Sequence, residues 1–322
     1  LECNEVLGLP ISLKAGRYDL FFGDGFLMCD GTPLDGSKTA FVNGALVSIG
    51  RKDPAVSLFT IWNRKNDDLL PRINDENRSL VENDQFLCGV FVNPVPDRLS
   101  RYLSDLEAYL IYKEERRPKS YAYLSVIGAR LIAPLAVVKA TVEAAYESGS
   151  EPESGGITQF GVPRRNIECV GWTAFVESNV ALPMAMQIRL GLVNLPGNNP
   201  QTRYNQEQWD PLLGRWPQWS ELYIYRLIPT GGVAYWKNLR LEFIRWRGSP
   251  WKELSFMLQF MRVNQLQPSS QWLGNLYAFK ASWDLTGCVS GHLIYEKFSL
   301  ATSGDPSLRD PDFLRLEISI AR

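Results

Sequence analysis

Apolar and polar residues alternate along most of the chain, and this period of two predicts β-strands. In residues 254–260, the sequence LSFMLQF places Leu and Phe on one face and Ser, Met and Gln on the other, which is typical of a half-buried strand on a sandwich core. Clusters of Gly, Pro, Asn, Asp and Ser separate most such segments and predict turns. We predict strands near Arg17–Phe22, Phe41–Ile49, Ser57–Trp62, Gln85–Val92, Leu106–Tyr112, Tyr121–Leu131, Ala136–Tyr146, Ile167–Glu177, Met186–Leu195, Ser220–Ile228, Leu239–Trp246, Glu253–Val263, Leu276–Trp283, Val289–Ser299 and Leu314–Ala321.

A change in composition divides the chain. Residues 147–156 read ESGSEPESGG, which lacks any apolar anchor and predicts a linker. Each side holds enough short strands for one sandwich. We therefore expect an all-β protein of two tandem jelly-roll domains with few short helices, the first over residues 1–150 and the second over residues 157–322.

Helical signals are few. Leu99, Leu103 and Leu106 follow a candidate N-cap at Asp97 and favour one or two helical turns in Arg98–Tyr109, and Arg203–Trp209 is a second candidate.

The stretch Asn194–Trp219 has no hydrophobic period and predicts a long ordered connection. Its three tryptophans, Trp209, Trp216 and Trp219, are our candidates for contacts between subunits.

Charge and composition narrow the function. The 322 residues carry a net charge of −1, which argues against nucleic-acid binding and against association with an anionic membrane. No apolar run has the length of about 18 residues that a membrane-spanning helix needs, and no signal-peptide pattern is present. The five cysteines form no CxxC element, so we expect free thiols in a reducing compartment such as the cytosol.

Catalytic motifs are absent from the sequence. It contains no P-loop, no GxGxxG and no GxSxG, and the single histidine, His292, reads as an exposed or hydrogen-bonded strand residue. The carboxylate pairs Asp67–Asp68 and Glu114–Glu115 lie in hydrophilic runs typical of solvated loops. We therefore expect no enzyme activity, no cofactor and no metal site.

Two stretches carry a family resemblance. Tyr235–Val263, with an aromatic and basic entry, a break at Gly248-Ser249-Pro250 and a second alternating strand, resembles the aromatic-rich strand pair in jelly-roll coat proteins of picorna-like viruses. Leu273–Leu300 is similar to the closing strands of the large coat protein of comoviruses and other plant secoviruses, with an LYA strand, a Thr-Gly turn and a Ser-Gly opening of the last strand. Both lie in the second half.

The resemblance implies a structural coat protein cut from a polyprotein. Such a protein would assemble in the host cytoplasm with copies of itself and a smaller coat protein or proteins into an icosahedral virion. It would touch the enclosed viral RNA through weak, non-specific contacts and would bind no membrane.

Two other readings remain open from the residues alone. Exposed tryptophans and a CDG turn within Phe26–Leu34 favour a carbohydrate-binding sandwich or a phage tail or adhesion protein. A jelly-roll hydrolase would need two carboxylates facing each other across a cleft.

Overall fold

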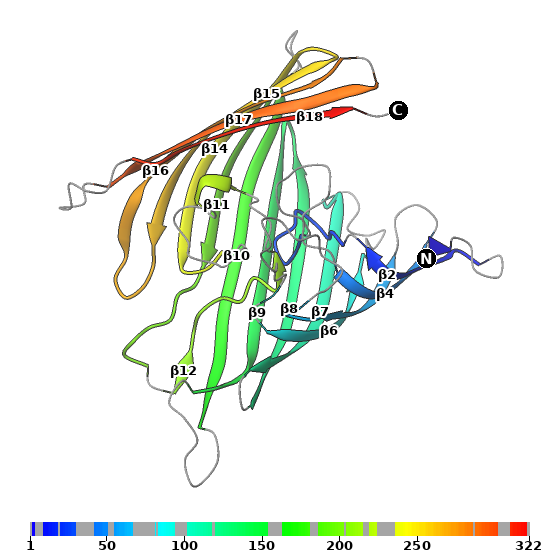
Figure 1. The fold of residues 1–322 in the computed structure, drawn as a ribbon, viewed down its shortest axis with the longest axis vertical. Helices are drawn as coiled ribbons and strands as arrows, with labels where there is room; N and C mark the ends of the chain where they lie inside the picture. Colours follow the sequence, from blue (N-terminus) through cyan, green and yellow to red (C-terminus); the bar gives the residue numbers. More distant parts are fainter. Residues whose placement is uncertain are drawn as a thin grey trace.

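The chain forms one large, strongly curved antiparallel sheet of 16 strands (Figure 1). The computed structural model describes residues 2–3, 9–18, 20–29, 42–50, 55–66, 81, 83–93, 102–117, 120–153, 163–180, 186–202, 204–214, 219–223, 236–285, 287–301 and 310–320. The strands are β1 (Glu2–Cys3), β2 (Ile11–Tyr18), β3 (Met28–Cys29), β4 (Val42–Ile49), β5 (Val56–Asn63), β6 (Asp84–Val92), β7 (Asp105–Arg117), β8 (Ser120–Leu135), β9 (Val138–Pro152), β10 (Arg164–Val180), β11 (Met186–Leu195), β12 (Asn205–Gln206), β13 (Leu213–Gly214), β14 (Leu239–Trp251), β15 (Leu254–Gln265), β16 (Gln271–Asp284), β17 (Val289–Leu300) and β18 (Asp312–Ile320).

The connectivity is a meander, in which each long strand pairs antiparallel with the next. The order runs β1-β2-β4 and then in sequence to β11, β14 and on to β18, while β12 adds to β10 in parallel. A jelly roll instead needs two packed sheets joined by Greek-key connections. The all-β prediction is confirmed, but the two tandem jelly rolls are wrong, because hydrogen bonding continues through a single sheet.

The acidic stretch at residues 147–156, which we predicted to be a linker between two domains, belongs largely to a strand. Residues 147–152 belong to β9 and pair with β10, with Glu147 opposite Cys169 and Glu151 opposite Arg165. Glu147 and Glu151 are buried on the inner side of the sheet. Polar composition therefore marks an inward-facing strand here, not a linker.

The predicted helices also differ from the structure. Residues 105–109 of the first candidate lie in β7, and Asn205–Gln206 of the second form β12. The strand predicted at Ser220–Ile228 begins with a short helical turn at residues 221–223, and the rest lies outside the described residues. No helix in the described part of the chain is long and apolar enough to span a membrane.

The two ends of the sheet have different connections. Between β8 and β9, β14 and β15, and β16 and β17, the chain turns within a few residues, and we call this side the short-turn end. The opposite side, where the chain passes from β5 to β6, β9 to β10, β11 to β14 and β17 to β18 over longer stretches, is the long-loop end.

The outer face of the sheet is largely apolar and exposed, whereas the inner face carries both buried apolar and buried charged side chains. Along β15, Leu258 points outward and is 49% exposed, whereas Gln259 points inward and is 4% exposed. Along β8, Ile127 on the outer face is 59% exposed, whereas Arg130 on the inner face is buried. The predicted alternation is thus correct, but exposed apolar residues line the outer face as well, because alternation fixes which residues share a face and not what that face contacts.

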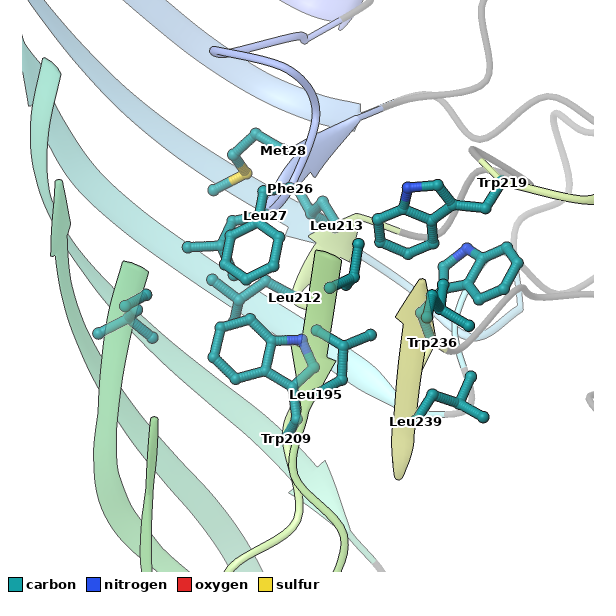
Figure 2. Packing of buried hydrophobic residues seen from close by; sticks show 14 of the residues in the cluster. Phe26, Leu27, Met28, Leu195, Trp209, Leu212, Leu213, Trp219, Trp236 and Leu239 are labelled. Atoms are coloured by element: carbon teal, nitrogen blue, oxygen red, sulfur yellow. The ribbon is translucent and has the colours of Figure 1, made fainter. Parts of the chain in front are cut away.

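Two distant segments fill part of the concave side, and we call them the plug: residues 20–29, and residues 204–214 with 219–223. They join where Leu213 and Gly214 of β13 pair in parallel with Met28 and Cys29 of β3. Figure 2 shows Phe26, Leu27 and Trp209 packed together against the sheet.

Two of the three candidate contact tryptophans lie inside this core. Trp209 is 1% exposed and its ring lies tilted against that of Phe26, with the centroids 5.0 Å apart. Trp219 is 8% exposed and meets Trp236 edge-on at 4.8 Å. Their rings are enclosed by the chain itself and are not on its surface. Trp216 lies outside the described residues.

Candidate functional site: the charged inner face

A row of basic side chains lies on the inner face of the second half of the sheet. Arg189 of β11 is directly opposite Arg245 of β14, and Arg247 follows on the same face two residues later. Next in line, Met257 of β15 is opposite both Arg247 and Lys280 of β16. Paired positions on adjacent strands lie about 5 Å apart. The four cations, which we call the basic row, therefore lie along one side of the inner face, with Met257 between Arg247 and Lys280.

Among the described residues, the three arginines of the basic row have one carboxylate partner, Glu177. Arg189 donates to Glu177 at 2.7 Å and lies over the Phe175 ring at 4.1 Å. Arg245 donates instead to a neutral group, the side-chain oxygen of Gln259, at 2.7 Å. Arg247 has no ion pair among the residues that the structure describes. The three arginines therefore carry more positive charge than Glu177 balances, which favours an anionic ligand.

A polar hollow of about 470 Å³ lies beside the basic row near the short-turn end. Its lining includes Arg247, Lys280, Gln187 and the hydroxyl groups of Ser255 and Ser282. Two cations with surrounding amide and hydroxyl groups can bind a carboxylate or phosphate and replace its hydration shell.

The plug is tied to the wall by charged groups. Arg130 of β8 donates to Asp24 of the plug at 2.9 Å and to Asp105 of β7 at 3.1 Å, with Glu107 at 3.5 Å. Lys113 of β7 pairs with Asp210, whose backbone N–H donates to Glu147 at 2.9 Å. These contacts hold both plug segments at defined positions.

The far side of the plug is held by hydrogen bonds. Glu296 of β17 accepts from the backbone N–H of Leu222 at 2.9 Å and from the Ser220 hydroxyl. Gln259 donates to the backbone oxygen of Trp219 at 2.9 Å while it accepts from Arg245. Gln259 thus links the plug directly to the basic row.

Burial raises the pKa of the Tyr223 phenol, so that hydroxyl stays neutral in the plug.

The sequence-predicted polar residues take different places. His292 is hydrogen-bonded as one reading expected, but buried, with its Nε2 2.7 Å from Arg315 and 3.8 Å from Glu317. Glu115 is not in a solvated loop: it is buried in β7, where it accepts from Gln85 at 3.2 Å. Asp67 and Asp68 lie outside the described residues. The described part of the chain contains no group of residues arranged to hold a metal ion.

Sequence reasoning missed the basic row. Its signal was present in the alternation Arg245-Trp246-Arg247, which puts two arginines on one face and the tryptophan on the other. We interpreted these residues as part of the alternating strand before the Gly248-Ser249-Pro250 break of a coat-protein strand pair, because the sequence does not indicate which face is enclosed.

The fold is a long-stranded antiparallel meander with an apolar outer face and an inner face that carries both buried apolar and buried charged side chains. No protein-family model matches the sequence, and no curated protein is similar enough to count as a match.

Solved structures share the fold. OccK11 (OpdR) of Pseudomonas aeruginosa superposes with a TM-score of 0.55 at 13% identity, over 96% of this chain and 76% of that one. The outer membrane protein opdK of the same organism gives 0.52 at 11%, again over 96% and 76%. OccK2 (OpdF), solved in complex with glucuronate, gives 0.53 at 12%, over 96% and 77%.

These likenesses overturn the functional reading from sequence. The matched structures include a Pseudomonas outer membrane protein and not a viral coat protein. The secovirus resemblance and the predicted capsid function are therefore wrong. The predicted coat-protein and RNA partners, and the virion and host-cytoplasm location, are wrong for the same reason. The phage tail, adhesion and carbohydrate-binding alternative is likewise unsupported. The prediction of no membrane contact fails with them. The coat-protein resemblance arose because alternating aromatic strands are common to many β-folds.

Proposed function

We propose that this protein is an outer-membrane channel whose inner face conducts small anionic solutes. Transport through such a channel needs no chemical step, so the proposal keeps the expectation that the chain is not an enzyme. The observation that carries it is the basic row, four cations on the concave face of a curved sheet whose outer face is apolar.

The outer face fits a bilayer. Along β8, the outward positions from Tyr123 to Leu135 are mostly apolar and exposed, including Ile127 and Leu131. This stretch is about 40 Å long, and a tilt of about 45° reduces its height to about 28 Å, close to the apolar band of outer-membrane barrels. Since unpaired strand edges are unfavourable in hydrocarbon, the proposal requires the edge strands β1 and β18 to be covered in the membrane.

The choice of solute follows from charge. Arg189, Arg245 and Arg247 outnumber Glu177, their one carboxylate partner among the described residues, and arginine binds carboxylates in a bidentate manner. Glucuronate, the ligand named for OccK2, is a carboxylate. We therefore expect small organic anions with one or two carboxylates to be the solutes.

Conductance in planar bilayers tests the proposal. We expect the wild-type protein to form channels whose reversal potential in a KCl gradient favours chloride. The double variant Arg245→Gln with Arg247→Gln should lose most of this preference, because it removes two cations from the pathway. The matched control Arg116→Gln changes an exposed arginine on the outer face of β7 and should leave selectivity unchanged. Absence of channels, or equal selectivity in all three proteins, would refute the proposal.

A further inference from the structure

A hollow interrupts the apolar outer face across β9, β10, β11 and β14. It has a volume of about 530 Å³, and its wall includes Val142, Val176, Leu190, Leu192, Ile244 and Phe260. The hollow forms where the outward side chains are small, since Ala174 lies between Val142 and Leu192 on the neighbouring strands.

A second hollow adjoins the first. The neighbouring hollow, of about 380 Å³, shares Ile244 and Phe260 with the first and continues past Trp246 and Phe279 toward Tyr295. We call the two together the outer groove. Its lining is almost wholly hydrocarbon and aromatic, so a flexible apolar chain fits it better than a polar ligand.

One end of the outer groove is cationic. Arg262 and Glu242 line this end and are directly opposite each other on β15 and β14, and Arg240 lies diagonally beside Arg262. Arg240 pairs with Glu242 at 3.2 Å, but both side chains are largely exposed, so the pair is weak. Arg262 lies over the Trp272 ring at 5.8 Å and has no carboxylate within ion-pair distance among the described residues. Two cations against one carboxylate leave positive charge for a phosphate.

We infer that the outer groove binds a phosphorylated, acylated glycolipid of the lipid A type, with an acyl chain along the groove and a phosphate between Arg240 and Arg262. This inference rests on the proposed function, which places the outer face in a membrane. The cationic end lies at the long-loop end of the sheet, and long loops lie on the extracellular side of outer-membrane barrels, whose outer leaflet contains this glycolipid. Basic side chains at membrane level bind lipid phosphates in the same way.

Native mass spectrometry of the full chain in detergent tests the inference. The protein is incubated separately with diphosphoryl lipid A and with phosphatidylglycerol, washed and measured. We expect retained lipid A to exceed retained phosphatidylglycerol. The double variant Arg240→Gln with Arg262→Gln, and the groove-filling variant Ala174→Phe, should each lower lipid A retention at least tenfold.

Two controls change the same residue types elsewhere on the outer face. Arg116→Gln removes an arginine at the long-loop end of β7, and Ala144→Phe enlarges an outward alanine that does not line the groove. Both should retain lipid A like the wild type.

Three results would contradict the binding of lipid A in the outer groove. Equal lipid A retention in wild type and groove variants, equal retention of phosphatidylglycerol, or a homo-oligomer that Ala174→Phe dissociates would overturn the inference. If the protein conducts in bilayers but retains no lipid A, only this inference fails. If it forms no channels, the proposed function fails and the groove has no membrane to face.

Discussion

The contact between Gly171 and Trp209 gives a sharp test of how the plug is seated. Gly171 lies in β10 with its missing side chain directed at the Trp209 ring: a Cβ there would be 2.5 Å from Cε3 and Cζ3 and 2.9 Å from Cδ2. The ring has nowhere to retreat, because Trp209 is 1% exposed and packs against Phe26. Gly171→Ala should therefore push the plug away from the wall.

The expected magnitude follows from known packing costs. An added methyl group in a closely packed core costs about 1–3 kcal/mol. Without the clash, a Gly→Ala change at a compatible backbone position would stabilise by about 0.4–1 kcal/mol, so the sign of the effect is itself diagnostic. Trp209→Ala should cost about 3–5 kcal/mol by leaving a cavity. In the double variant the new methyl group enters that cavity, so the two costs should fall short of additivity by about 1–3 kcal/mol.

Urea unfolding in detergent micelles, followed by far-ultraviolet circular dichroism, measures these free energies of unfolding for the wild type, the two single variants and the double variant. A Gly171→Ala protein as stable as the wild type, or strictly additive costs in the double variant, would refute the packing of Trp209 against β10.

Two further changes address the polar contacts of the plug. Arg130→Met should destabilise by about 3–5 kcal/mol, because it leaves Asp24, Asp105 and Glu107 together without their shared cation. Adding Asp24→Asn should recover part of that loss in the same urea titration, and no recovery would contradict the assignment of Asp24 as a principal partner. Glu296→Leu should expose the Leu222 amide, since its acceptor is removed. Hydrogen exchange measures this directly, and unchanged protection of Leu222 would show that Glu296 does not hold the plug.

Much of the fold's local structure was predictable. The alternation of residues located the long strands of the sheet, some almost to the residue, as at Gln85–Val92 against Asp84–Val92 and at Met186–Leu195. Other strands run further than predicted, as β9 does, which continues to Pro152 where the prediction ended at Tyr146. Strand formation depends on neighbours two residues apart, and a sequence displays these directly. Arg245 and Arg247 share a face for the same reason.

The site itself was not predictable from these patterns. The basic row needs Arg189, Arg247 and Lys280 to come from different strands, and their proximity depends on the registers between β11, β14, β15 and β16. The prediction of a solvated Glu115 failed for a related reason: its neighbours in the sequence are charged, but its surroundings are Lys113 and Gln85 on the enclosed side.

By itself, the sequence determined that this protein is built of β-strands and which side chains share each face, since both follow from the two-residue repeat of an extended chain. Only the tertiary structure decided that the strands join in one meander and that the apolar face lies outside. It also decided that Trp209 and Trp219 fill the interior. These features depend on contacts between distant residues and on the surrounding solvent, and the same alternation suits a sandwich in water or a sheet in a membrane.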